Sequence, residues 1–278
     1  MAEVGGGTEG TSRVADVLLL FVDGPSTLGV SRIARELGLS KAVVHRILVS
    51  LVSRGMVALD PVSHEYRLGP AAAAIGARAL RESDLRGAAL PLLRELRDAT
   101  QETVTLSTPV PHGRVYLDQV VGTHEIKMTV ELGRRFPLHA GSSGKCMLAF
   151  LDDAEREEVL AGGLAALTPG TVTDPDALRD ELDRIVERRF AASAGERQAD
   201  AGSVAAPVFG VSGEVLGAIS VCGPRYRVTD EFVAAIAPRV VAVADRISHR
   251  LGAAPRRAPA MAAHAGAPVV ATPERTAR

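Results

Sequence analysis

Two amphipathic segments joined by the three residues Gly38-Leu39-Ser40 constrain the fold of this chain more than any other feature. After this turn, apolar residues recur at Val44, Ile47, Leu48 and Leu51, the spacing of one face of an α-helix. Glycine suits a tight bend between helices, and serine is a favoured residue at a helix N-terminus. We therefore predict a helix over 41–54 that packs against a shorter helix before the turn.

The flanking segments extend this pair of helices into a larger unit. A first helix is predicted from Ser12 to Gly24-Pro25, and Ser31 is expected to cap the second helix. Beyond Gly55 the apolar period becomes two on both sides of Asp60-Pro61, which predicts a β-hairpin. Three helices followed by a hairpin is the order of a winged helix-turn-helix, predicted here for residues 11–69.

The outward face of the third predicted helix carries the candidate DNA contacts. A recognition helix touches base edges in the major groove with its N-terminal residues. Arg46 suits a guanine edge, Ala42 and Val43 suit thymine methyl groups, and Lys41 suits a phosphate. The full set of expected contacts, with the hairpin included, is Lys41, Ala42, Val43, His45, Arg46, His64 and Arg67. The alternative is a helical subdomain whose polar face is only solvated.

The distribution of charge permits binding to nucleic acid. Residues 11–69 carry 7 Lys and Arg against 5 Asp and Glu, whereas residues 70–251 carry 21 against 25. The chain as a whole has a formal net charge of −1. A mildly basic first part on an acidic body is compatible with double-stranded DNA as a partner.

The rest of the chain mixes helices with strands that pair as hairpins. An Ala-rich linker helix is predicted over 70–86, followed by an effector-binding domain over 87–251. Alternating apolar residues predict strands through 104–106, 115–117, 126–130, 203–209 and 215–222. Further helices are predicted over 88–101, 143–151, 152–161, 174–189 and 229–250. This pattern indicates an α+β fold with an antiparallel sheet flanked by helices.

Composition excludes several classes of protein. The two cysteines, Cys146 and Cys222, form no CxxC pair, and the seven histidines form no HExxH motif, so neither a metal nor a cofactor is expected. The N-terminus lacks the features of a signal peptide, and no apolar run is long enough for a membrane helix. We expect a cytoplasmic protein without a membrane partner. Residues 1–10 and 252–278 are predicted to be disordered because they lack periodicity.

An enzymatic function is the main alternative to DNA binding. Ser142 and Lys145 have the S-x-x-K spacing of a serine nucleophile, but the partner motifs S-D-N and K-T-G do not occur. A phosphate-binding loop is excluded because His139 occupies the position of its first glycine. The Ser212 segment fails as a nucleophile elbow because Glu214 replaces the last glycine. A third possibility is a scaffold that binds a protein through its C-terminal sheet. No enzymatic function is favoured.

Three separate segments resemble the IclR family of transcriptional regulators. They are GVSRIARELGLSKAVVHRILVSLVSRGMVALDPVSHEYRLGP (29–70), RRFPLHAGSSGKCMLAFL (134–151) and SVAAPVFGVSGEVLGAISVCGPRYRVT (203–229). The resemblance implies a winged helix-turn-helix, a linker helix and a GAF-like effector domain. It also implies homodimers or homotetramers on a palindromic operator, and small-molecule effectors such as carboxylates or aromatic acids. Ala42-Val43 departs from the family's Ser-Thr, so the operator sequence cannot be carried over, and Ser203 replaces the cysteine of some members.

The same resemblance implies an effector site. Matching positions are Gly141, Ser142, Ala201, Ser203, Ser220 and Cys222. The residues themselves add that the run 139–145 enters a helix, whose free N–H groups attract anions. Ser220 and Cys222 are two apart and share one face of a strand. Structural roles stay open for this segment: Ser142 as a helix cap, Ser220 and Cys222 in the core, His139 as a structural histidine, and Lys145 in a surface ion pair.

Overall fold

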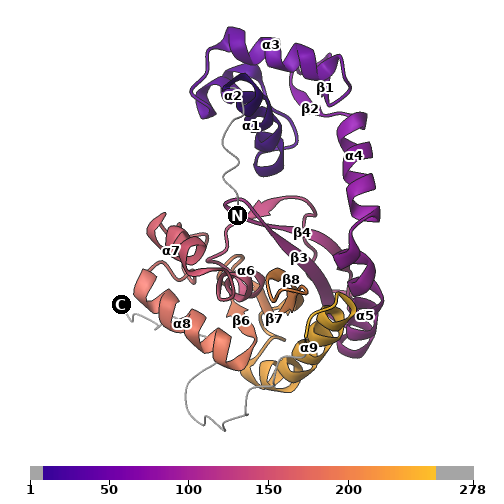
Figure 1. Ribbon diagram of the computed structural model, residues 1–278, viewed down its shortest axis with the longest axis vertical. Helices are drawn as coiled ribbons and strands as arrows, with labels where there is room; N and C mark the ends of the chain where they lie inside the picture. The colour runs from indigo at the N-terminus through magenta and orange to yellow at the C-terminus, as the bar shows by residue number, and fades with distance from the viewer. Residues whose placement is uncertain (1–8, 255–278) are drawn as a thin grey trace. The chain divides into compact units, whose positions relative to one another are not determined.

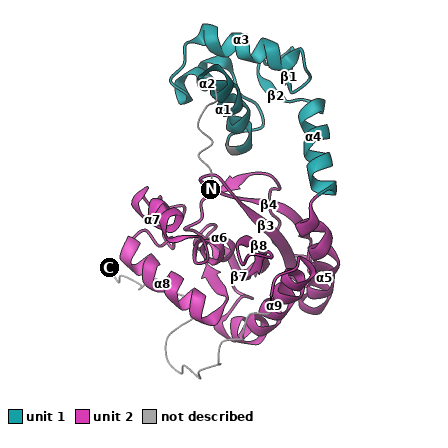
Figure 2. Ribbon diagram, in the orientation of Figure 1, with its two compact units in different colours: residues 1–82 teal, residues 83–278 magenta. Residues whose placement is uncertain are grey.

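The computed structural model describes residues 9–254, which divide into two compact units (Figure 2). The first unit ends at Glu82 and the second begins at Ser83. The predicted disorder of residues 1–8 and 255–278 lies outside the described residues. The limits of that disorder are wrong by a few residues, because Glu9 and Gly10 begin the first helix and Ala253 is buried in the core of the second unit.

The first unit has the element order of a winged helix-turn-helix (Figure 1). Its elements are α1 (Glu9–Asp23), α2 (Val30–Glu36), α3 (Lys41–Val52), β1 (Val57–Leu59), β2 (Tyr66–Leu68) and α4 (Pro70–Arg81). Strands β1 and β2 pair antiparallel, with Val57 opposite Leu68. This order confirms the predicted sequence of three helices and a hairpin.

The core of the first unit forms on the predicted face of α3. Val44, Ile47, Leu48 and Leu51 are all buried, and they share one cluster with apolar residues of α1, α2 and the hairpin. Ser40 caps α3 by accepting a hydrogen bond from the backbone N–H of Val43 at 3.4 Å. This cluster is what holds the outward face of α3 in place.

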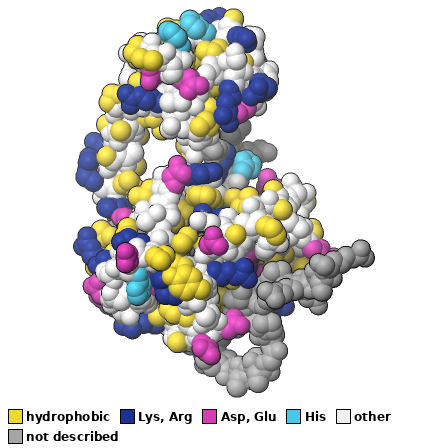
Figure 3. All heavy atoms as spheres, turned by 180° about the vertical axis from the view of Figure 1, so that it is seen from behind, with side chains coloured by type: hydrophobic (Ala, Val, Ile, Leu, Met, Phe, Trp, Pro, Cys, Tyr) yellow, Lys and Arg dark blue, Asp and Glu magenta, His cyan; other side chains and the backbone are white. Residues whose placement is uncertain are grey.

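The helix predicted over 70–86 is in fact two helices. Helix α4 ends at Arg81, and α5 (Asp84–Thr100) begins after Ser83, whose side chain accepts a 3.3 Å hydrogen bond from the N–H of Arg86. The periodicity missed the break because Ser83 is a helix-capping residue inside an otherwise continuous helical pattern. Helix α4 has no buried residue, and apolar side chains reach the surface in this part of the chain (Figure 3).

The second unit is built on a six-stranded sheet with the order β5-β4-β3-β8-β7-β6. All neighbouring strands pair antiparallel, which confirms the α+β class. The strands are β3 (Thr103–Val110), β4 (Gly113–Val120), β5 (Arg135–Phe136), β6 (Ala191–Ala194), β7 (Ala201–Phe209) and β8 (Val215–Pro224). The short strands β5 and β6 were not predicted, because two to four residues carry too little alternation to detect.

Helices cover both faces of this sheet. Helix α5 and α9 (Asp230–Arg250) pack against one face, where Val104, Ile219 and Val221 are buried. Helix α6 (Ser142–Leu148) and α8 (Pro175–Arg188) pack on the other face with Ala205 and Ala218, and α7 (Asp153–Ala161) lies beside them. In β8, side chains alternate between the two faces, so Ser220 and Cys222 point away from the α5–α9 core.

No helix among residues 9–254 is both long enough and apolar enough to cross a membrane.

Candidate functional site

The N-terminal part of α3 presents most of the predicted DNA contacts to solvent. Lys41, Ala42, His45 and Arg46 are exposed, and Arg67 is exposed on β2. Val43 is half-buried because it packs against the core of the first unit, so only part of its side chain is available. Lys and Arg side chains are spread over the face of this unit seen in Figure 3 rather than gathered in one block.

The turn of the hairpin is fixed by Asp60. Its carboxylate accepts hydrogen bonds from the backbone N–H groups of Val62, at 2.8 Å, and Ser63, at 3.1 Å. These two bonds stabilise the charged form and lower the pKa of Asp60. They order the tip of the wing, where Val62 is exposed and His64 has a positive φ of 56°.

The six predicted effector residues surround one pocket in the second unit. Gly141, Ser142, Ala201, Ser203, Ser220 and Cys222 all line it. The space among the lining residues is about 430 Å³, with the open mouth included. The remaining lining residues are Arg114, Tyr116, Met128, Val130, Ser143, Ser193, Arg197, Gln198 and Gly202. The sheet and α6 therefore bring together residues that lie more than 80 positions apart.

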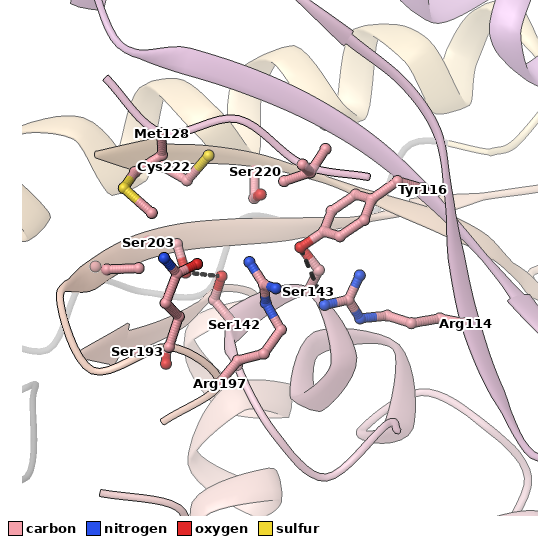
Figure 4. A pocket seen from close by; sticks show the side chains of 15 residues that line it. Arg114, Tyr116, Met128, Ser142, Ser143, Ser193, Arg197, Ser203, Ser220 and Cys222 are labelled. Atoms are coloured by element: carbon pink, nitrogen blue, oxygen red, sulfur yellow. Dashed lines mark hydrogen bonds between the residues drawn. The ribbon is translucent and has the colours of Figure 1, made fainter. Parts of the chain in front are cut away.

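Strand pairing places the serines of the pocket. Ser203 on β7 lies opposite Cys222 on β8, and the Ser203 hydroxyl is 2.7 Å from that of Ser142 (Figure 4). The Ser220 hydroxyl is 2.8 Å from the hydroxyl of Thr105 on β3. Desolvation raises the pKa of the Cys222 thiol to about 12, so this side chain is a neutral thiol at physiological pH.

Two arginines that sequence reasoning missed dominate the electrostatics of the pocket. Arg114 is 1% exposed, and its guanidinium lies 4.5 Å from the centre of the Tyr116 ring. The guanidinium of Arg197 lies 4.9 Å from the centre of the Phe136 ring. Neither arginine forms an ion pair within residues 9–254, and no acidic residue lines the pocket. The lining therefore carries two positive charges.

The burial of Arg114 is costly. Its guanidinium donates to the hydroxyls of Ser107, at 3.3 Å, and Tyr116, at 3.1 Å, but its Nε has no partner within the described chain. Desolvation lowers its pKa, although arginine keeps its proton at neutral pH. The sequence contains one signal for these pocket residues, a charged residue and an aromatic residue two positions apart at 114 and 116, which places them on the same face of a strand. The apolar alternation of Val115 and Leu117 favours those two residues as the buried ones instead, whereas in the structure Arg114 and Tyr116 are the more deeply buried pair.

Lys145 and Glu196 do not line the pocket, but they form a buried ion pair that contacts the lining residue Gly141. The Lys145 ammonium is 2.6 Å from Glu181 and 2.5 Å from Glu196, and the lysine is 1% exposed. The other oxygen of Glu196 accepts a 3.1 Å hydrogen bond from the N–H of Gly141. Lys145 therefore forms an ion pair, as the structural alternative expected, but the pair lies in the protein interior and not at the surface.

These contacts also revise the roles suggested for the 139–145 segment. Gly141 is the N-terminal cap residue of α6, with a φ of 82°, and Ser142 makes no capping hydrogen bond. Since Glu196 occupies the N–H of Gly141, one of the N–H groups expected to hold an anion is already bonded. His139 is buried and its Nε2 is 2.9 Å from the carbonyl oxygen of Ala165, which confirms the structural alternative for this residue.

The geometry does not assemble a nucleophile. The Ser142 hydroxyl is bonded to Ser203, whereas the Lys145 ammonium is held by two carboxylates. A serine nucleophile needs a base within hydrogen-bond reach. No group of three or more His, Cys, Asp or Glu suited to a metal ion occurs within the described residues.

The segment predicted as a strand over 126–130 is not one, yet it closes one side of the pocket. Its backbone is bonded to side chains instead of to a neighbouring strand. The Gln119 amide accepts from the N–H of Val130 at 3.0 Å and donates to its carbonyl at 2.8 Å. Thr103 donates to the carbonyl of Met128 at 2.6 Å. A side-chain amide thus takes the place of a strand partner, which residue alternation cannot reveal.

Comparison with known proteins agrees with this architecture. The model of the IclR helix-turn-helix domain matches residues 10–61, and that of the bacterial transcriptional regulator IclR C-terminal domain matches residues 77–249. The HTH-type transcriptional regulator BhcR of Paracoccus denitrificans is 34% identical over 92% of this chain and 91% of its own. The glycerol operon regulatory protein of Streptomyces griseus is 35% identical, covering 77% of this chain and 84% of its own.

Solved structures show the same arrangement of elements. An IclR transcriptional regulator from Alicyclobacillus acidocaldarius gives a TM-score of 0.78 at 27% identity, over 89% of this chain and all of that one. An IclR homologue from Microbacterium hydrocarbonoxydans, complexed with 4-hydroxybenzoate, gives 0.71 at 28% identity, over 87% and 99%. The two domain models match in order along most of the chain, and the relatives are transcriptional regulators. The chain belongs to the IclR family of helix-turn-helix transcriptional regulators.

Proposed function

We propose that this regulator binds a palindromic operator and that a small carboxylate, bound in the pocket of the second unit, controls this binding. The observation that carries the proposal is the pair Arg114 and Arg197, two guanidinium groups on a lining without acidic residues. An anionic ligand group would offset the cost of burying Arg114, and guanidinium binds carboxylates through paired hydrogen bonds.

A solved relative supports an acid as the ligand. The Microbacterium hydrocarbonoxydans homologue is a complex with 4-hydroxybenzoate, which carries a carboxylate. In the present chain, such a group would lie near the Arg114 and Arg197 guanidiniums, which Figure 4 shows close to the Tyr116 hydroxyl. The serines of α6, β7 and β8 would then contact the remainder of the ligand.

The DNA-binding part of the proposal rests on the exposed end of α3. We assign Arg46 to a guanine edge, Lys41 to a phosphate, and Ala42, Val43 and His45 to neighbouring groove contacts, with Arg67 at the DNA backbone. Two copies of a helix-turn-helix read two half-sites related by the symmetry of the dimer, so a homodimer or a pair of dimers predicts a palindrome.

Control requires that the ligand bind one arrangement of the protein better than another. We assign transmission to α4, which joins the hairpin to the second unit and has no buried residue of its own. Its attachment to the first unit is a backbone hydrogen bond from Ala71 to the carbonyl of Gly55, at 3.0 Å. The ligand would change the spacing of two DNA-binding units through this helix.

Selection of genomic DNA fragments by the purified full chain tests the DNA-binding part. We expect a palindromic sequence that is still recovered when the salt concentration is raised moderately, because specific contacts add to the salt-sensitive phosphate contacts. Diffuse recovery that disappears with salt, with and without carboxylates present, would contradict the proposal.

The effector part is tested by Ser220→Val, which removes a hydroxyl from the pocket lining. We expect this variant to lose the effect of a carboxylate on DNA binding while it still binds the selected fragment. Thr105→Val is the matched control, because it breaks the same hydroxyl pair from a residue outside the lining. An equal loss of response in both variants would assign the pair a structural role.

A further inference from the structure

We infer that the effector is a short carboxylic acid that carries hydroxyl groups along its carbon chain. This inference rests on the proposed carboxylate and adds the chemistry of the rest of the ligand. It comes from the serines of the pocket, which the arginine argument does not use.

Two of these serines have hydroxyl groups without a protein partner. Ser143 on α6 is 2% exposed and Ser193 on β6 is 5% exposed, and both line the pocket. Within the described residues, neither side chain forms a hydrogen bond. Their hydroxyl oxygens are not among the fully buried unpartnered atoms of the described chain, so they are accessible from the pocket, and a ligand that excludes water from them must replace its hydrogen bonds. A ligand that supplies donors and acceptors would satisfy both.

The other polar groups of the lining keep unused bonding capacity. Ser142 and Ser203 bond to each other, and Ser220 bonds to Thr105. Because a hydroxyl has one donor hydrogen and two acceptor lone pairs, each member of these pairs can take another hydrogen bond. Hydroxyls therefore meet the ligand from α6, β6, β7 and β8, several sides of one small space.

The arrangement of charge and hydroxyls separates two ends of the ligand. In the view of Figure 4, Ser193 and Ser203 lie toward the opposite end of the pocket from Arg114. A carboxylate held by the arginines would thus direct the rest of its chain toward Ser193 and Ser203, whereas Ser143 lies beside the arginines in the same view and would meet the ligand near its carboxylate. A purely apolar chain would exclude water from Ser143 and Ser193 without replacing its hydrogen bonds, which is unfavourable.

An unsubstituted aromatic acid fits this lining less well. The faces of the Tyr116 and Phe136 rings already carry the guanidiniums of Arg114 and Arg197, so they are not free to stack on a ligand ring. Among the lining residues, Met128 and Val130 offer the larger apolar side chains. Sites built to bond a hydroxyl reject analogues that lack it more strongly than apolar sites reject extra groups.

Binding of matched pairs of acids to the full chain tests the inference. Titration calorimetry would compare glycerate with propionate, threonate with butyrate and gluconate with hexanoate, and 4-hydroxybenzoate with all of them. We expect at least one hydroxy acid to bind about tenfold or more tightly than its unsubstituted partner. Removing the hydroxyls in Ser143→Ala and Ser193→Ala should each reduce this preference about threefold to tenfold, the usual effect of one hydrogen bond. Ser212→Ala, at an exposed turn, is the control and should preserve the preference.

The possible results separate this inference from the proposed function. If hydroxy and unsubstituted acids bind equally, or if 4-hydroxybenzoate binds most tightly, the hydroxy-acid inference is wrong and the carboxylate proposal stands. The same conclusion follows if the serine variants keep the full preference. If no acid in the set binds while the DNA fragment is still recognised, both the inference and the carboxylate proposal are overturned.

Discussion

The guanidinium of Arg114 lies over the ring of Tyr116, two residues along the same strand, and donates a 3.1 Å hydrogen bond to its hydroxyl. Strand geometry explains the contact, since residues i and i+2 share one face of β4. The pair places a buried positive charge in the pocket without a neighbouring carboxylate. Such a charge costs stability, and the proposed carboxylate ligand would offset that cost.

Replacing the charged Arg114 side chain is expected to affect thermal stability and carboxylate binding in different ways. Arg114→Met should leave the Tm unchanged or raise it, because an unpaired buried charge is replaced by an apolar side chain of similar length. The same change should weaken binding of carboxylates at least about tenfold, by loss of a charge-assisted hydrogen bond. Thermal unfolding and calorimetry measure the two effects. Arg179→Met, which removes an exposed charge on α8, should change neither; a strongly destabilised Arg114→Met would refute this reading.

The buried Lys145 should behave in the opposite way. Lys145→Met leaves Glu181 and Glu196 without their cation, and breaking a buried pair costs about 3–5 kcal/mol. Since Glu181 is partly exposed, we expect about 3 kcal/mol, measured by urea unfolding followed by circular dichroism. The double variant Lys145→Met/Glu196→Gln should recover part of the loss. A single variant as stable as the parent would show that the network adds nothing to stability.

The two candidate DNA contacts on α3 predict different signatures. Arg46→Ala should lose about 1–3 kcal/mol on the selected operator and tolerate other bases at one position. Lys41→Ala should weaken binding to all sequences by a similar factor and reduce the salt dependence. Fluorescence anisotropy with operator and mutated operators at several salt concentrations distinguishes them. Uniform weakening by Arg46→Ala would assign that residue to a phosphate instead.

Because both cysteines are buried free thiols, we predict that the native protein resists thiol reagents and loses stability at alkaline pH. Desolvation raises the pKa of Cys222 to about 12, from an ordinary value of 9.0, and also raises that of Cys146. A raised thiol pKa means that the folded state holds its proton more tightly than the unfolded state. Its stabilising contribution is therefore complete below pH 9.0 and decreases as the pH rises from there toward 12.

At pH 8 we expect neither thiol to react with a disulfide reagent in the native protein, and both to react in denaturant. Rapid reaction of Cys222 in the native protein would show that its thiol is accessible and ionised.

Elements with strong apolar periodicity could be predicted from the sequence. The structure of a segment whose backbone is hydrogen-bonded to side chains could not. The face of α3 and the shared face of Ser220 and Cys222 on β8 follow from periods of 3.6 and 2, which local residues determine. The 126–130 segment also alternates, but its partners are the side chains of Gln119 and Thr103 rather than a strand. Pairing of this kind depends on tertiary contacts that no local pattern contains.

The pocket was predicted in part for the same reason. Gly141, Ser142, Ser203 and Ser220 were found through a family resemblance, and Ser143 lies in the run 139–145 that was predicted to attract an anion, whereas Arg114, Arg197 and Ser193 were not found. A buried arginine contradicts the usual partition of charge to the surface, so a sequence pattern places it outside. Its location becomes evident only when β3, β4 and β8 are paired.

The most direct test of the central claim measures DNA binding and the effector together. The full chain and Arg114→Met would be titrated onto the selected palindromic fragment, with and without a panel of small carboxylates, by fluorescence anisotropy. We predict that at least one carboxylate changes the affinity of the parent chain for DNA by about 5- to 150-fold, the usual range of allosteric coupling, and leaves that of Arg114→Met unchanged. An equal change in both proteins, or no change with any carboxylate, would contradict the account.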